Sequence, residues 1–284
     1  MKILVTGYNG QLGYDVVKVG QRQGLEMIGS TSRELDITDR LRVQDFMNEI
    51  KPDAIIHCAA YTAVDNAEDD KEKSWDVNVK GTKNLAEAAK SIKSKFMYIS
   101  TDYVYDGKGT IPYKETDKPN PSGYYGLTKY EGEKVVQSLF ENFFIVRISW
   151  VFGINGNNFI KTMLRLAETR EELNVVADQY GSPTYTLDLS KLLIEMVQSE
   201  KYGIYHASNE GFCSWADFAT EIFRLAEKRV SVSPITTAQY PTRAIRPKNS
   251  RMSKQKLVEN GFKSLPSWQD ALNRYLEELH NEVK

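Results

Sequence analysis

The first half of the chain alternates short apolar runs with amphipathic stretches. The runs are rich in Ile, Val, Phe and Tyr and show little period-two alternation, which is typical of strands covered on both faces. They are residues 2–7, 25–30, 54–60, 96–100 and 143–149. Helical periodicity lies between and after them, at residues 11–23, 40–51, 78–91 and 125–139. This alternation predicts an α/β fold with a doubly wound parallel sheet and right-handed crossovers.

The second half is less regular. Residues 172–197 and 203–226 each predict a strand, a turn and a helix, and Ser214 is the expected N-cap of the second of these helices. Three prolines punctuate residues 234–253, which we therefore predict to be a loop. Short elements joined by such loops suit a smaller region built onto the first sheet.

Composition narrows the range of partners. The 284 residues carry 37 Lys and Arg against 38 Asp and Glu, so no broad basic surface for nucleic acid or anionic membranes is expected. Cys58 and Cys213 are the only cysteines, and they suggest neither a disulfide framework nor a zinc site. The N-terminal apolar run is too short for a signal peptide, and no later run is long enough to span a membrane. We therefore expect a cytoplasmic protein.

A glycine pattern follows the first predicted strand. In "GYNGQLG", Gly7 would allow a tight turn, Gly10 would let backbone N–H groups approach a pyrophosphate, and Gly13 would let helix and strand pack closely. The N-terminus of the next helix adds positive potential and free donors. The spacing is GxxGxxG rather than GxGxxG, but its place between a strand and a helix predicts a dinucleotide cofactor.

The segment "STSRELDITD" follows the second predicted strand, and we expect it to contact the adenosine end of that cofactor. Asp36 with Ile37 is a candidate for contacts to the adenine end. Ser32 and Arg33 could accept a 2′-phosphate, or Arg33 could be a solvated loop charge. Both NADPH and NADH therefore stay open.

A tyrosine followed four residues later by a lysine occurs three times: Tyr14–Lys18, Tyr125–Lys129 and Tyr130–Lys134. At about 100° per residue, only Tyr125 and Lys129 lie on the apolar face of their helix. The pairs at Tyr130 and Tyr14 point away from the apolar stripes. An ammonium beside a phenol favours the phenolate and lowers the phenol's pKa, as a general acid requires. The alternative is a tyrosine that caps the core beside a snorkelling lysine.

Hydroxyl groups end the fourth predicted strand, where a doubly wound sheet forms its ligand crevice. Ser100 and Thr101 could orient a carbonyl oxygen there, or they could simply cap the strand end.

Together these features resemble the extended short-chain dehydrogenase/reductase family over essentially the whole chain. Within it, six segments are similar to those of dTDP-4-dehydrorhamnose reductases: "TGYNGQLG", "AAYTAVDNAE", "STDYVYDG", "YYGLTKYEGE", "RISWVFG" and "DQYGSPT". The resemblance implies a Rossmann-type sheet. We expect residues 1–150 to form the dinucleotide-binding domain. Residues 151–284 would be mainly substrate-binding and interleaved with the last sheet elements.

The resemblance also implies roles for single residues. Tyr125 would donate a proton, Lys129 would lower its pKa and hold the nicotinamide ribose, and Thr101 would hydrogen-bond the substrate carbonyl. The implied cofactor-binding residues are Gly7, Gly10, Gln11, Leu12, Gly13, Asp36, Ile37, Ala60, Tyr61, Thr62, Tyr125 and Lys129. The implied substrate-binding residues are Thr101, Asp102 and Trp150. No metal ligands are assigned.

The implied reaction is reduction of the C4 keto group of dTDP-4-dehydro-L-rhamnose, a small nucleotide sugar, by NADPH or NADH. Related 4,6-dehydratases carry Thr-Asp-Glu after the fourth strand; this chain has Tyr103 at the third position and so lacks their base. Another nucleotide-sugar epimerase or reductase stays open. So does a non-catalytic NADP-binding regulatory subunit, like that of methionine adenosyltransferase.

The role of three C-terminal arginines and the oligomeric state each allow more than one interpretation. One of Arg243, Arg246 and Arg251 could bind the nucleotide diphosphate, or all three could be solvated loop charges. Some relatives form dimers around Mg²⁺ held by acidic residues. A homodimer is therefore open, although no acidic cluster of this chain could be assigned to a metal.

Overall fold

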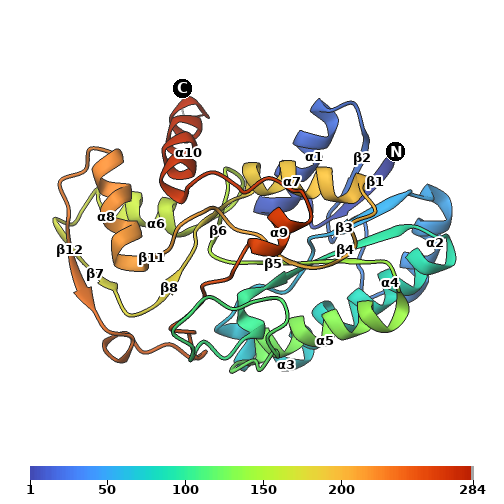
Figure 1. Cartoon of the computed structure of the whole chain (residues 1–284), viewed down its shortest axis with the longest axis horizontal. Coiled ribbons are helices and arrows are strands. Elements are labelled where there is room, and N and C mark those ends of the chain that lie inside the picture. The colour runs from blue at the N-terminus through green and yellow to red at the C-terminus, as the bar shows by residue number, and fades with distance from the viewer. Residues whose placement is uncertain (283–284) are drawn as a thin grey trace.

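A parallel sheet of six strands forms the centre of the computed structural model, which describes residues 1–282 (Figure 1). Its strands are β1 (Lys2–Thr6), β2 (Glu26–Ser30), β3 (Ala54–His57), β4 (Lys95–Thr101), β5 (Phe144–Ile148) and β10 (Gly203–His206). From edge to edge the order is β2-β1-β3-β4-β5-β10. Because β1 pairs with β2 on one side and β3 on the other, the order reverses between β1 and β3. The predicted doubly wound sheet is confirmed, and its ligand crevice belongs at this reversal.

Helices cover both faces of the sheet (Figure 1). On one face lie α1 (Gln11–Arg22) and α7 (Thr186–Gln198), and on the other α2 (Arg40–Ile50), α4 (Thr82–Ser91) and α5 (Tyr124–Leu139). Successive strand residues enter opposite layers: Ile3 and Val5 pack with α1 and α7, whereas Leu4 packs with α2 and α4. Burial on both faces explains why the strand sequences show no alternation.

A second lobe with its own apolar core stands at one end of the sheet (Figure 1). Its helices are α6 (Phe159–Leu166), α8 (Trp215–Leu225) and α10 (Trp268–Glu282). Three short strand pairs complete it: β6 (Val151–Phe152) with β9 (Thr184–Tyr185), β7 (Glu172–Val176) with β12 (Ser231–Ile235), and β8 (Tyr180–Gly181) with β11 (Cys213–Ser214). The predicted N-cap of α8 is confirmed, since Ser214 forms a capping box with Asp217. The short helix α9 (Gln255–Glu259) lies against β10.

The helix predicted at residues 78–91 begins earlier than expected. A continuous helical run comprises α3 (Lys71–Trp75), a π-helical turn (Asp76–Gly81) and α4. The π-helical turn inserts an extra residue, which breaks the 3.6-residue periodicity on which the prediction depends.

The predicted loop 234–253 is also partly wrong, because β12 extends to Ile235 and includes Pro234. Among the described residues β12 pairs only with β7, so its other edge is unpaired and needs no N–H donor, and the proline is tolerated there.

Tyr14 and Lys18 were expected to point toward solvent, but the second lobe covers their face of α1. Tyr14 stacks on Tyr8, with 6.2 Å between ring centroids, and packs against the second lobe. Lys18 pairs with Glu278 of α10 at 3.4 Å. A helical wheel shows the side facing away from the sheet, but it does not show that another lobe covers that side. Within residues 1–282, no helix is long and apolar enough to cross a membrane.

Candidate active site

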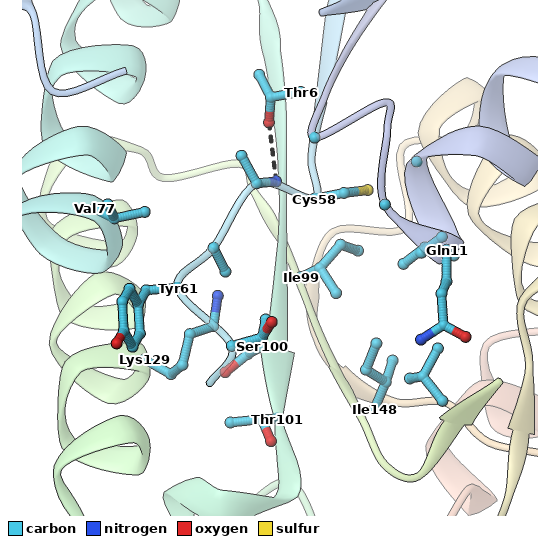
Figure 2. Close-up of a pocket in the computed structure, with 18 of the residues that line it drawn as sticks. Thr6, Gln11, Cys58, Tyr61, Val77, Ile99, Ser100, Thr101, Lys129 and Ile148 are labelled. Carbon is cyan, nitrogen blue, oxygen red and sulfur yellow. Dashed lines mark hydrogen bonds between the residues drawn. The ribbon is translucent and has the colours of Figure 1, made fainter. Parts of the chain in front are cut away.

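A cavity of about 560 Å³ opens at the carboxyl ends of the central strands, where the strand order reverses (Figure 2). The residues that the sequence singles out for cofactor and substrate all line it: Gly7, Gly10, Gln11, Leu12, Gly13, Asp36, Ile37, Ala60, Tyr61, Thr62, Thr101, Asp102, Tyr125, Lys129 and Trp150. Ser32 and Ser100 also line the cavity. Arg33 is exposed and lies outside the lining. The three candidate arginines Arg243, Arg246 and Arg251 lie outside it as well.

The glycine loop leaves room for a ligand at the start of α1. Gly7 has φ +71°, and a Cβ there would lie 2.8 Å from the Ala59 nitrogen. A Cβ on Gly13 would lie 2.4 Å from the Gly7 oxygen, so only glycine lets α1 approach β1 this closely. Gly10 is the N-cap of α1, and no side chain of the described residues caps that helix end. These features fit a pyrophosphate, which the helix terminus would attract.

The loop after β3 forms a second wall and is fixed from two sides. Thr6 accepts a hydrogen bond from the Ala59 N–H at 3.2 Å (Figure 2). Asn78, in the π-helical turn, accepts from the Tyr61 N–H at 2.8 Å and donates to the Tyr61 carbonyl at 3.2 Å. Its amide also donates to the Thr128 hydroxyl, next to Lys129. Sequence reasoning missed Asn78, which is buried. The available signal was an asparagine between two valines in the helical stretch "DVNVKGT".

The lysines of the two Tyr–Lys pairs of α5 differ in burial, as the helical wheel predicts. The tyrosines do not: both are partly buried, and Tyr130, which the wheel places toward water, packs against a small apolar cluster that includes Val104 and Met252. Lys129 is only 3% exposed and reaches into the cavity (Figure 2). Tyr125 also lines this cavity. The Lys134 side chain is 50% exposed and pairs with Glu131 at 2.7 Å. Only the Tyr125–Lys129 pair is therefore placed to contact a bound ligand.

Burial dominates the proton affinities of this pair. It lowers the pKa of Lys129 to about 7, against the opposing charge of Glu133. It raises the pKa of Tyr125, although an interaction with the Thr101 hydroxyl acts in the opposite direction. The pKa of Tyr125 therefore lies above that of a free tyrosine. That Lys129 favours the phenolate stays a prediction. The Lys129 ammonium lies 4.1 Å from the centroid of the Tyr98 ring. The phenol of Tyr125 keeps its proton at neutral pH, as a proton donor must.

Thr101 is the last residue of β4, Asp102 follows it, and both line the same cavity. The Thr101 hydroxyl accepts from the Tyr103 N–H at 3.2 Å and donates to Asp102 Oδ1 at 3.1 Å. Burial raises the pKa of Asp102 to about 6, and interactions with the Ser250 and Thr101 side chains oppose that rise. Among the described residues, Asp102 Oδ2 is buried without a hydrogen-bond partner. A buried carboxylate oxygen without a partner is uncommon in folded proteins, and this makes Asp102 a candidate for contact with a bound ligand.

A second groove, of about 840 Å³, lies beside this site. It is lined by aromatic and basic side chains, among them Tyr180, Tyr240, Lys108, Arg246, Lys248 and Arg251. Arg246 donates to the Tyr103 hydroxyl at 3.0 Å and also pairs with Asp65. Because Tyr103 lines the first cavity and packs edge-to-face on Tyr125, Arg246 stands where the two cavities meet. Arg243 is exposed and pairs with Asp69 instead. Within residues 1–282, no group of three or more His, Cys, Asp or Glu side chains is arranged to hold a metal ion.

Known proteins share this architecture along the whole chain. The family model for the RmlD substrate binding domain matches residues 1–281. A dTDP-4-dehydrorhamnose reductase from Aggregatibacter actinomycetemcomitans is 44% identical, over 95% of this chain and 97% of its own. The crystal structure of a dTDP-4-dehydrorhamnose reductase from Clostridium acetobutylicum has a TM-score of 0.96 at 44% identity, covering 99% of this chain and 100% of that one. That of the Bacillus anthracis dTDP-4-dehydrorhamnose reductase, solved in complex with NADP, has a TM-score of 0.95 at 43% identity, covering 98% and 100%. The resemblance inferred from six short segments is thereby confirmed, and the chain belongs to the RmlD family of dTDP-4-dehydrorhamnose reductases.

Proposed function

We propose that the protein reduces the C4 keto group of dTDP-4-dehydro-L-rhamnose to give dTDP-L-rhamnose, with NADPH or NADH as the reductant. The observation that carries the proposal is the Tyr125–Lys129 pair, whose lysine is buried and which lines the same cavity as the uncapped glycine loop of α1. The relatives named above bear this activity in their names, and the similar protein from Bacillus anthracis binds NADP.

The cavity offers a contact for each part of a dinucleotide. Gly7, Gly10 and Gly13, with Gln11 and Leu12, would hold the pyrophosphate at the start of α1. Asp36 and Ile37 would border the adenine end, and residues 60–62 would line the middle of the cofactor. Tyr125 and Lys129 would hold the nicotinamide ribose. When bound, the nicotinamide supplies a hydride to the carbonyl carbon of the substrate.

The side chains of the protein would supply the proton and hold the sugar. The Thr101 hydroxyl would hydrogen-bond the C4 oxygen and place it beside the Tyr125 phenol, which donates its proton as the carbonyl becomes an alcohol. The resulting phenolate would be stabilised by the ammonium of Lys129. Asp102 Oδ2, which lacks a partner among the described residues, would accept from a sugar hydroxyl, and Trp150 would contact the same sugar.

Arg246 is the arginine that we assign to the nucleotide diphosphate, because it stands between the catalytic cavity and the aromatic groove. Arg246→Met is expected to raise the KM for the nucleotide sugar by about tenfold or more, as loss of a charge-assisted hydrogen bond does. The matched control is Arg243→Met, which removes an exposed pair and should leave the KM unchanged. Equal effects of the two substitutions would rule out this assignment.

Three broader expectations stay proposals. Residues 1–150 would bind the cofactor and residues 151–284 would mainly bind the substrate, although β10 and α7 return to the central sheet. A cytoplasmic location fits the two cysteines, neither of which is in a disulfide. A homodimer stays a prediction.

Cofactor oxidation tests the function directly. With dTDP-4-dehydro-L-rhamnose present, the wild-type protein is expected to oxidise one molecule of NADPH or NADH for each molecule of sugar reduced. Without the sugar, neither cofactor should be oxidised. Parallel runs with the two cofactors would establish which one is preferred. No sugar-dependent consumption of either cofactor would refute the proposed activity.

A further inference from the structure

Trp150 lies between β5 and β6 in a backbone conformation that bulky residues rarely adopt. It lines the catalytic cavity, and its φ is +48°. A left-handed conformation at a tryptophan costs energy and persists only where the surroundings enforce it. The contacts that hold Trp150 are therefore informative about what the conformation achieves.

Two residues outside the cavity lining hold the Trp150 indole. The ring of Trp215 stacks on it with 3.6 Å between centroids and 11° between planes. On Gly181, a Cβ would lie only 2.6 Å from Trp150 Cε2. The φ of Gly181 lies outside the left-handed region, so this position needs glycine for space rather than for backbone freedom.

Both supports belong to one small framework in the second lobe. Gly181 of β8 pairs with Cys213 of β11, and Trp215 begins α8 directly after that strand. The Phe159 ring packs on Trp215 at 4.7 Å between centroids. The Thr184 N–H donates to the Trp150 carbonyl at 3.0 Å, which ties down the backbone of Trp150 as well.

We propose that Trp215 and Gly181 are positioning residues that fix the Trp150 indole as a wall of the sugar subsite, and so set the affinity for the 6-deoxysugar. This inference rests on the proposed function. It gives a physical role to the segment "DQYGSPT", whose glycine leaves room for the indole and whose threonine binds the Trp150 backbone. A deoxysugar presents C–H and methyl groups, and a rigid aromatic surface contacts these at little entropic cost.

The test compares Trp215→Leu, Trp215→Phe and Gly181→Ala with the wild type. Trp215→Leu and Gly181→Ala are each expected to raise the KM for dTDP-4-dehydro-L-rhamnose by about tenfold, the loss of one aromatic contact. The KM for NADPH should not change, because the glycine loop that would hold it lies on the other lobe. Trp215→Phe keeps a flat ring, so its KM for dTDP-4-dehydro-L-rhamnose should stay close to that of the wild type.

Several outcomes would overturn the inference. One is an unchanged sugar KM in both Trp215→Leu and Gly181→Ala; another is an equal rise in the KM for NADPH, which would indicate general damage. Thermal melting shows whether each variant folds, and Gly181→Ala, which adds one methyl group, carries the test if Trp215→Leu does not fold.

Binding of dTDP-L-rhamnose to the wild type, measured by tryptophan fluorescence, separates this inference from the proposed function. A wild type that neither binds nor reduces the sugar refutes the proposed function and this inference with it, whereas a wild type that does both and tolerates all three substitutions refutes the inference alone.

Discussion

Tyr125→Phe is expected to lower kcat by about 10³-fold, within the range that general acid catalysis contributes. The substitution removes one oxygen from a residue that lines the cavity and leaves the aromatic ring against Tyr103. The KM for NADPH should change little, because the glycine loop is untouched. The measurement is steady-state cofactor oxidation with saturating dTDP-4-dehydro-L-rhamnose.

Tyr130→Phe is the matched control. Tyr130 lies on the same helix with the same spacing to a lysine, but its partner Lys134 is half exposed and pairs with Glu131. Full activity is expected for this variant. Retained activity in Tyr125→Phe, or an equal loss in Tyr130→Phe, would disprove the role given to Tyr125.

Lys129→Met should lower kcat by about 10²-fold or more and, at the same time, stabilise the fold. Burial lowers the pKa of Lys129 to about 7, so the folded protein holds this proton less tightly than the unfolded chain does. The resulting cost to stability is fully present below pH 7, declines as pH rises through the range between the folded and unfolded pKa values, and vanishes above the unfolded value. Methionine avoids that cost, and we expect it to raise the free energy of unfolding by about 2–4 kcal/mol at pH 6.

Urea unfolding at pH 6 and at pH 9.5 checks this prediction. The gain from Lys129→Met should be larger at the lower pH, because the buried ammonium is fully charged there. Lys134→Met is the control, and this exposed site should change stability by less than about 0.5 kcal/mol at either pH. A destabilised Lys129→Met protein, or a gain that is the same at both pH values, would contradict the pKa assigned to Lys129.

Local patterns predicted the central sheet because its strands and helices have the regular periods of buried elements. The glycine loop and the inward Tyr–Lys pair were accessible for the same reason: both follow from neighbouring residues and helical geometry. The raised pKa of Tyr125 could not be predicted from the sequence. A helical wheel shows that a residue faces inward, but it does not show how completely the surroundings exclude water.

Contacts between distant segments could not be predicted from patterns. Arg246 meets Asp65 and Tyr103 from far along the chain, across a loop whose course is set by tertiary packing. Asn78 acts through a π-helical turn, which interrupts the periodicity that sequence reasoning follows. Gly181 belongs to "DQYGSPT", a segment quoted only for its family resemblance. The physical role of this glycine depends on the position of Trp150, which the sequence does not show.

Deuterium transfer tests the central claim most directly. The wild-type protein would be incubated with dTDP-4-dehydro-L-rhamnose and the preferred cofactor, deuterated at both hydrogens of nicotinamide C4, and the product examined by NMR. The account predicts dTDP-L-rhamnose with one deuterium at C4 of the sugar. Absence of a reduced sugar, or a product with protium at C4, would contradict it.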